Sequence, residues 1–307
     1  MKVTVLFGGP SAEREVSLVS GRSVIEGLKQ AGHDVHPSDI SPTDLAGLQR
    51  PADVVFPVLH GQFGESGELQ EILEQRGLTF VGSGSIASRC GMNKDQAKRV
   101  WQRAGLPTAE HEVIGSIIDA PGAIRRIGVP CVVKPVDSGS SIDVYICKTA
   151  QAAEQNCEKV VAKHGEAMVE RFIKGTEITV GILEEKALSP IRITTSHEFF
   201  DYQAKYVGND AKHDFNLGLP SNVVAELQEL ARMAHLTLGC RDLSRVDFIV
   251  DAQNRPYLLE INTMPGFTPK SLLPEAAGHD GIDFARLVDR LVCRAYNRGA
   301  RAIRAAV

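Results

Sequence analysis

Apolar runs alternate with amphipathic stretches across residues 1–90. This pattern predicts strands at 3–7, 53–59 and 78–81 and helices at 12–30 and 67–76. Strands that alternate with helices are typical of an open, mostly parallel sheet with helices on its faces. We therefore expect residues 1–90 to form an N-terminal α/β domain of the Rossmann-like kind.

The remaining chain predicts two further mixed units, which begin after the Gly-Ser-Gly-Ser run at 82–85. Residues 91–183 are expected to hold helices 94–104, 119–127 and 150–163 and strands 130–134, 144–147, 167–171 and 177–183. Residues 184–307 are expected to hold strands near 187–195, a helix at 221–238, a hairpin and a terminal helix from Asp283. The polar segment 197–218 lacks clear periodicity, which is typical of a functional lid.

The hairpin is expected where two strand-like runs, 245–250 and 256–262, flank a polar stretch with turn chemistry. A four-residue loop at 252–255 would pair Asp251 with Pro256. Because neighbouring strands pair residue by residue, this turn fixes the register of the whole hairpin.

In this register Asp247 lies opposite Glu260, and Arg245 lies opposite Asn262. Residues two apart on a strand share a face, so all four polar side chains point the same way. Two carboxylates directly opposite each other repel and destabilise a plain hairpin. A hard divalent cation removes this penalty, since Asp, Glu and Asn oxygens are the ligands that Mg²⁺ takes together with nucleotide phosphates. The hairpin therefore predicts an Mg²⁺ (or Mn²⁺) nucleotide site.

Composition excludes several classes of function. The chain has 307 residues, 43% hydrophobic and 23% charged, with a net charge of −4, so no basic field favours nucleic acid or an anionic membrane surface. No run approaches the roughly 18 apolar residues of a membrane span, and the opening apolar run is too short for a signal peptide. The six cysteines show no C-x-x-C spacing, which indicates reduced thiols in a cytoplasmic protein.

Three segments suit phosphate groups. A Gly-rich turn at 8–15 leads into a helix, although Ser11 as an ordinary helix cap explains this segment better. Lys134 ends a strand before a loop of small residues, 137–141, which offers backbone N–H groups and hydroxyls; an ordinary flexible turn is the alternative. Lys94 begins a helix and is either a second phosphate contact or a solvated residue.

Four further residues stand at positions where a ligand can be contacted. Glu170 ends one strand and Glu177 begins the next, where backbone and carboxylate suit adenine and ribose, although glutamates are common at strand ends. His60 ends a strand and is either structural or ligand-binding. Gly266, in the turn after the second hairpin strand, lets a backbone N–H approach a reacting oxygen.

The chain also resembles a known family, the D-alanine–D-alanine ligases, which are ATP-grasp enzymes of peptidoglycan precursor synthesis. The resemblance runs in order from Lys2 to about Val292 and rests on six motifs: Glu13-Arg14-Glu15-Val16-Ser17, His60-Gly61, Gly139-Ser140-Ser141, Tyr202-Gln203-Ala204-Lys205-Tyr206, Arg245-Val246-Asp247 and Glu260-Ile261-Asn262-Thr263-Met264-Pro265-Gly266. It implies an α/β ATP-grasp fold in which two α+β domains clasp ATP after the N-terminal domain.

The resemblance implies that ATP phosphorylates the carboxylate of a first D-alanine and that the amine of a second D-alanine attacks the acyl phosphate. It implies metal ligation by Asp247, Glu260 and Asn262, and ATP binding by Lys94, Lys134, Ser141, Glu170, Glu177 and Lys205. Substrate contacts are implied for Glu13, His60, Ser271 and Leu272, and catalytic roles for Glu13, Ser140, Tyr206, Arg245 and Gly266. The family is also commonly homodimeric.

Four residues depart from the family pattern. Asp143 and Asp242 stand where glycine is usual, and Ser66 and Asn93 stand where aspartate is usual. A carboxylate at 143 is expected to repel ATP unless it points away, so we expect Asp143→Gly to tighten ATP binding.

Two other functions remain open from the sequence. A ligase with a different second substrate, such as D-serine, shares the same motifs. A nucleotide-binding regulatory protein without turnover would bind ATP but release no ADP on addition of amino acids. The joint presence of Glu13, Arg245, Asp247, Glu260 and Asn262 argues against the second of these.

Overall fold

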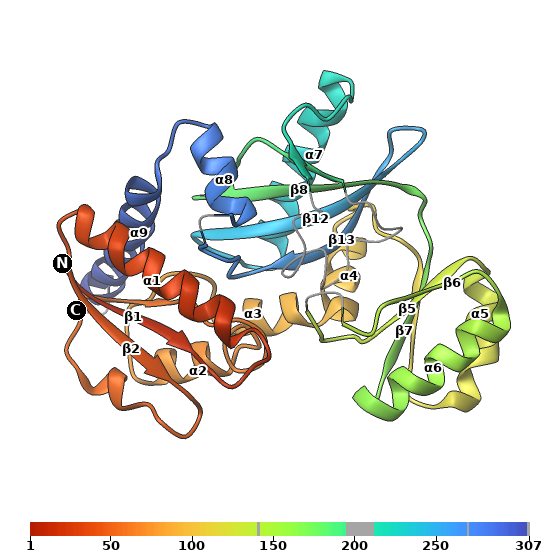
Figure 1. Ribbon diagram of the computed structural model, residues 1–307, viewed down its shortest axis with the longest axis horizontal. Helices are drawn as coiled ribbons and strands as arrows, with labels where there is room; N and C mark the ends of the chain where they lie inside the picture. Colours follow the sequence, from red (N-terminus) through yellow and green to blue (C-terminus); the bar gives the residue numbers. More distant parts are fainter. Residues whose placement is uncertain (140–141, 195–211, 269, 306–307) are drawn as a thin grey trace.

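A computed structural model of the chain describes residues 1–139, 142–194, 212–268 and 270–305. Three sheets follow one another along the molecule, with the N-terminal sheet at one end and the sheet that contains β5 and β7 at the other (Figure 1). Within the described ranges no helix is both long and apolar enough to cross a lipid bilayer.

The N-terminal sheet is parallel, in the order β2-β1-β3, as the sequence predicts for this region. It consists of β1 (Lys2–Gly8), β2 (Asp34–Ile40) and β3 (Val54–Pro57), accompanied by α1 (Arg14–Gln30), η1 (Ala46–Gln49) and α2 (Glu68–Gln75). Strand β2 is not predicted from the sequence because this edge strand is polar and only partly buried. The strand expected at 78–81 is a single parallel bridge between Val55 and Phe80.

The last helix returns to this first unit. Helix α9 (Phe284–Ala305) lies beside α1, and the two are close enough that a Cβ on Gly27 would come within 2.9 Å of the Phe284 ring. Val288 and Leu291 share one buried core with Val3 and Phe56. The core of the N-terminal unit is therefore completed by the other end of the chain (Figure 1).

The second sheet is antiparallel, in the order β4-β7-β5-β6. Its strands are β4 (His111–Ile114), β5 (Cys131–Lys134), β6 (Tyr145–Cys147) and β7 (Ala167–Arg171). Helices α5 (Ala120–Ile127) and α6 (Ala150–His164) share its hydrophobic core, and η2 (Ile117–Asp119) precedes α5. This sheet leaves the opposite face available for a ligand.

The third sheet is the largest and runs β11-β10-β8-β12-β13, with β9 added to β8. Its strands are β8 (Gly175–Leu183), β9 (Lys186–Ala187), β10 (Ile191–Thr194), β11 (Lys212–Asp214), β12 (Leu243–Asp251) and β13 (Pro256–Asn262). One core joins it to α3 (Ser85–Met92), α4 (Lys94–Arg103) and α7 (Ser221–Thr237), whereas α8 (Leu272–His279) belongs to the core shared with the N-terminal unit. The sequence does not predict helices α3 and α8 or strands β4 and β11, and β11 lies within the segment 197–218 that was expected to be a lid.

The predicted hairpin register is confirmed at the four polar residues that were expected to face the ligand, and it is wrong next to the turn. Asp247 pairs with Glu260 and Arg245 with Asn262, but Pro256 pairs with Val250 rather than with Asp251. A β-bulge after Asp247 absorbs the one-residue difference, because the partner strand contributes an extra residue there.

Candidate active site

Two cavities meet at the edge of the third sheet. The large cleft, about 1110 Å³, lies between the second and third sheets; the small cleft, about 470 Å³, lies between the third sheet and the start of α1. Lys94 and Glu260 line both cavities. A molecule in the large cleft can therefore meet a molecule in the small one beside these two side chains.

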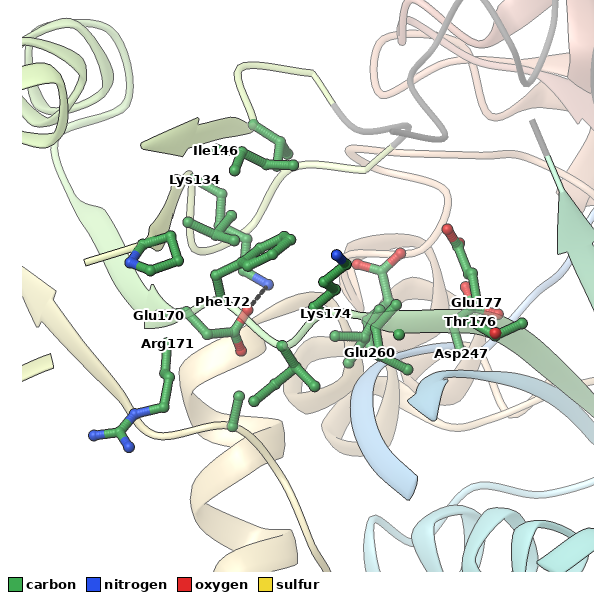
Figure 2. A pocket seen from close by; sticks show the side chains of 18 of the residues that line it. Lys134, Ile146, Glu170, Arg171, Phe172, Lys174, Thr176, Glu177, Asp247 and Glu260 are labelled. Atoms are coloured by element: carbon green, nitrogen blue, oxygen red, sulfur yellow. Dashed lines mark hydrogen bonds and ion pairs between the residues drawn. The ribbon is translucent and has the colours of Figure 1, made fainter. Parts of the chain in front are cut away.

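The large cleft has apolar walls and a buried ion pair at one end. Lys134, the last residue of β5, places its Nζ 2.6 Å from Oε2 of Glu170 on β7 (Figure 2). Burial raises the pKa of Glu170, but Lys134 and Lys98 lower it more, and the resulting pKa is about 2. Glu177 on β8 lines the same cleft, toward the side where Asp247 lies (Figure 2).

Lys94 connects the loop after β5, which is expected to bind phosphate, to β13, which is expected to bind the metal ion. Its Nζ lies 2.6 Å from the Ser138 carbonyl oxygen and 3.2 Å from Glu260 Oε2, and its backbone N–H donates to Val136. Asn93 precedes it as the cap of α4, and its side chain accepts from Gln96 N at 2.9 Å. Asparagine thus retains the capping function of an aspartate at this position.

The paired carboxylates of the hairpin fit a hard cation. Asp247 accepts from Thr179 Oγ1 at 2.6 Å and from the Arg245 guanidinium at 2.9 and 2.8 Å. With Glu260 beside Lys94, each carboxylate faces a protein cation, which compensates their mutual repulsion. Among the described side chains no three His, Cys, Asp or Glu gather as a metal cluster. The donor set is instead two carboxylates and the Asn262 amide oxygen, which suits Mg²⁺ shared with phosphates.

The small cleft is lined by Glu13, directly before α1, and by the loop after β3. The Glu13 carboxylate lies so near Gly61 that a Cβ there would be 3.1 Å from its Oε2. His60 is 5% exposed, its Nδ1 is 3.7 Å from Glu65 Oε1, and its Nε2 has no hydrogen-bond partner among the described residues. Burial lowers the pKa of His60, but Glu65 raises it more, so the pKa lies above its ordinary value.

The opposite wall of the small cleft is the turn from β13 into α8. A Cβ at Gly266 would come within 2.8 Å of Ser271 Oγ, so a side chain there would displace the Ser271 hydroxyl. Ser271 is the N-cap of α8 and Leu272 its first residue. The free backbone N–H groups at this helix start make it suitable for a carboxylate.

The structure therefore brings the described site candidates to two adjoining cavities. Ser140, Ser141, Lys205 and Tyr206 lie outside the described residues. Glu65 and Thr179, which hold His60 and Asp247, were not identified from the sequence. Glu65 had one visible signal, an acidic residue in the short loop after the strand that ends at His60.

The two aspartates at glycine-type positions both adopt positive φ angles, 56° for Asp143 and 67° for Asp242. The Asp143 carboxylate lies 2.7 Å from both Lys163 Nζ and His164 Nε2 at the end of α6. Asp143 is absent from the described lining of the large cleft. Because its charge is directed to α6, the expectation that Asp143 repels ATP needs revision.

Asp242 is fully buried and connects three parts of the chain. Its carboxylate accepts from Gly82 N at 2.8 Å and from Arg298 of α9, and it lies 3.5 Å from Arg294 Nε. Arg298 also donates to the Phe80 carbonyl at 2.6 Å. This aspartate therefore fastens the end of the N-terminal unit to the third sheet and the last helix.

Two antiparallel sheets that enclose a cleft with two lysines and a facing carboxylate pair define an ATP-grasp enzyme. Residues 100–293 match the family model for the D-ala D-ala ligase C-terminus, and residues 2–46 and 39–83 match that for the N-terminus. The chain belongs to the D-alanine–D-alanine ligase family.

Individual relatives align with this chain over nearly its whole length. A D-alanine–D-alanine ligase of Anaeromyxobacter dehalogenans (strain 2CP-C) is 40% identical, across 95% of this chain and 96% of the relative. The crystal structure of the D-alanine–D-alanine ligase from Bacillus anthracis superposes with a TM-score of 0.88 at 30% identity, covering 98% and 99% of the two chains. The crystal structure of the VanG D-Ala:D-Ser ligase from Enterococcus faecalis superposes with a TM-score of 0.85 at 27% identity. The match covers 96% of this chain and 99% of that chain.

Proposed function

We propose that this protein joins two D-alanines into D-alanyl-D-alanine with hydrolysis of ATP to ADP and phosphate, for peptidoglycan precursor synthesis. The observation that carries the proposal is the junction of the two cavities at Lys94 and Glu260. A carboxylate in the small cleft and a terminal phosphate in the large cleft can react only where the cavities meet.

The large cleft takes the nucleotide. Its apolar wall, which includes Val132 and Ile146, accommodates the base, while Lys134 and Lys94 attract the phosphates. Asp247, Glu260 and Asn262 would hold Mg²⁺ (or Mn²⁺), which supplies charge neutralisation for phosphoryl transfer. Arg245 and Lys94, which contact these carboxylates, would act on the phosphoryl group and the developing oxyanion.

The small cleft takes the two amino acids. Glu13 attracts the ammonium group of the first D-alanine, whose carboxylate oxygen attacks the γ-phosphorus as the bond to ADP breaks. The start of α8, at Ser271 and Leu272, receives the carboxylate of the second D-alanine. Its neutral amine attacks the acyl carbon, and the Gly266 N–H and Arg245 stabilise the tetrahedral oxyanion. The bond from carbon to the phosphate oxygen then breaks, and the nitrogen gives its extra proton to the departing phosphate. We assign His60, which lines the same cleft, to substrate binding.

A D-Ala–D-Ser ligase is the second candidate, because the structural relatives include a D-Ala:D-Ser ligase.

We further propose that the protein is a cytoplasmic homodimer, by analogy with the family. Light scattering coupled to gel filtration tests this state, and a mass near the 33.2 kDa of one chain contradicts it.

Product analysis tests the activity. Purified protein with Mg-ATP and D-alanine should release ADP and give a product whose mass is that of two alanines minus one water, and L-alanine should give none. Parallel reactions with D-alanine plus D-serine or D-lactate measure the choice of second substrate. ATP binding without D-alanine-dependent ADP release would refute the proposal and favour a non-catalytic nucleotide-binding protein.

A further inference from the structure

Lys98, one helical turn after Lys94 on α4, is fully buried and belongs to the described lining of neither cleft. An ammonium group taken out of water is costly unless other groups compensate for the lost hydration. Lys98 is therefore a charged residue that the proposed reaction does not use directly.

Three groups hold the Lys98 ammonium in place. Its Nζ lies 2.5 Å from Glu170 Oε1 and 2.5 Å from Thr108 Oγ1, and it lies 3.3 Å from the Leu258 carbonyl oxygen on β13. Thr108 Oγ1 also donates to this carbonyl at 2.9 Å. Two of these three groups, Thr108 and the Leu258 carbonyl, belong to residues outside the described lining of the large cleft, whereas Glu170 lines it.

Glu170 is shared between two lysines. Oε1 faces Lys98 and Oε2 faces Lys134, so the buried triad carries one carboxylate and two ammonium groups. If Lys134 were the sole partner of Glu170, the two charges would cancel and little attraction would remain for a phosphate. With Lys98 on the other oxygen, the triad keeps one net positive charge next to the large cleft.

We propose that Lys98 is a positioning residue for ATP: it compensates Glu170 from outside the cleft and thereby leaves the charge of Lys134 available to the nucleotide phosphates. This inference rests on the proposed function, since it assumes that the large cleft binds ATP. It assigns Lys98 an effect on nucleotide affinity that passes through one carboxylate, and it predicts no direct contact with the ligand.

A double-mutant cycle tests this inference. Binding of Mg-ADP is measured by calorimetry for wild type, Lys98→Met, Glu170→Gln and the double variant. When Glu170 is present, we expect Lys98→Met to weaken Mg-ADP binding about tenfold. In the Glu170→Gln background the same substitution should weaken binding less than twofold, because the negative charge that Lys98 compensates is gone. In steady-state assays the KM for ATP should rise while kcat and the KM for D-alanine stay nearly constant.

Trp101→Phe on the same helix is the matched control, because it loosens buried packing without changing a charge. It should lower the melting temperature and leave nucleotide affinity unchanged. Equal losses from Lys98→Met in both backgrounds, or no loss in either, would overturn the inference. If the single variant does not fold, the pair Glu170→Gln and Lys98→Met/Glu170→Gln still decides, because a tenfold difference between them contradicts the mechanism. A wild-type protein that binds no Mg-ADP would instead refute the proposed function.

Discussion

Replacing Asp242 by asparagine should destabilise the protein by removing one buried negative charge without changing the size of the side chain. Asparagine tolerates the positive φ of 67° at this position nearly as well as aspartate does. Its amide oxygen can still accept from Gly82, but its NH₂ group cannot accept from Arg298, and Arg294 keeps only its ion pair with Glu185.

The magnitude follows from the exposure of the partners. Removing one member of a buried ion pair costs roughly 3–5 kcal/mol when the remaining charge stays buried. The side chains of Arg294 and Arg298 are 34% and 32% exposed, so both can recover part of their hydration. We therefore expect a loss of about 2–3 kcal/mol, near the value of a single charged hydrogen bond. For a chain of 307 residues this corresponds to a melting temperature roughly 3–5 °C lower.

Thermal unfolding followed by circular dichroism or calorimetry measures this difference. Asp143→Asn is the matched control, since Asp143 has a similar φ of 56° but pairs with Lys163, whose side chain is 61% exposed. The control should lose no more than about 1 kcal/mol. A melting temperature for Asp242→Asn within about a degree of wild type would show that the carboxylate does not fasten the N-terminal unit.

Three further predictions concern individual side chains. Asp143→Gly should leave ATP affinity within about twofold of wild type, because the carboxylate lies on Lys163 and His164; a tenfold change in a binding titration would place it near the nucleotide. Arg245→Met should lower kcat in ADP-release assays by about 10²–10³-fold, the usual loss for an oxyanion donor, and unchanged turnover would remove Arg245 from the reaction. Burial lowers the pKa of His235 to about 4, so protonation favours the unfolded chain and stability should fall as pH drops from the ordinary value of about 6.5 towards 4. His235→Gln should reduce this slope in urea titrations, whereas an identical slope contradicts the assignment.

The hairpin could be predicted from the sequence because charge pattern and strand period act locally. Asp247 and Glu260 were placed opposite each other correctly, although the assumed turn was off by one residue. The prediction had the wrong turn and no bulge. These two errors cancel, because the bulge shifts the pairing by one residue and brings Asp247 opposite Glu260. Next to the bulge, Leu258 forms a bridge with Thr108 and its N–H donates to the Pro107 carbonyl, a long-range contact that no local pattern reveals.

Features that depend on tertiary contacts were missed. Helix α3 begins at Ser85, within a run read as a linker, and it is stabilised by the core of the third sheet. Helix α8 has only eight residues and follows the turn at Gly266. The pairing of Lys98 with Glu170 joins α4 to β7, and the burial of both charges becomes visible only once these elements meet.

The return of α9 to the N-terminal sheet has a consequence for synthesis on the ribosome. The apolar side chains of Val3, Val24 and Phe56 emerge early, but Val288 and Leu291, which complete their core, are translated long after them. The first unit must therefore wait for almost the whole polypeptide before its hydrophobic face is covered. Nascent chains released before α9 should be bound by chaperones or degraded, and shortening the gene from its 3′ end should abolish the fold at the opposite terminus.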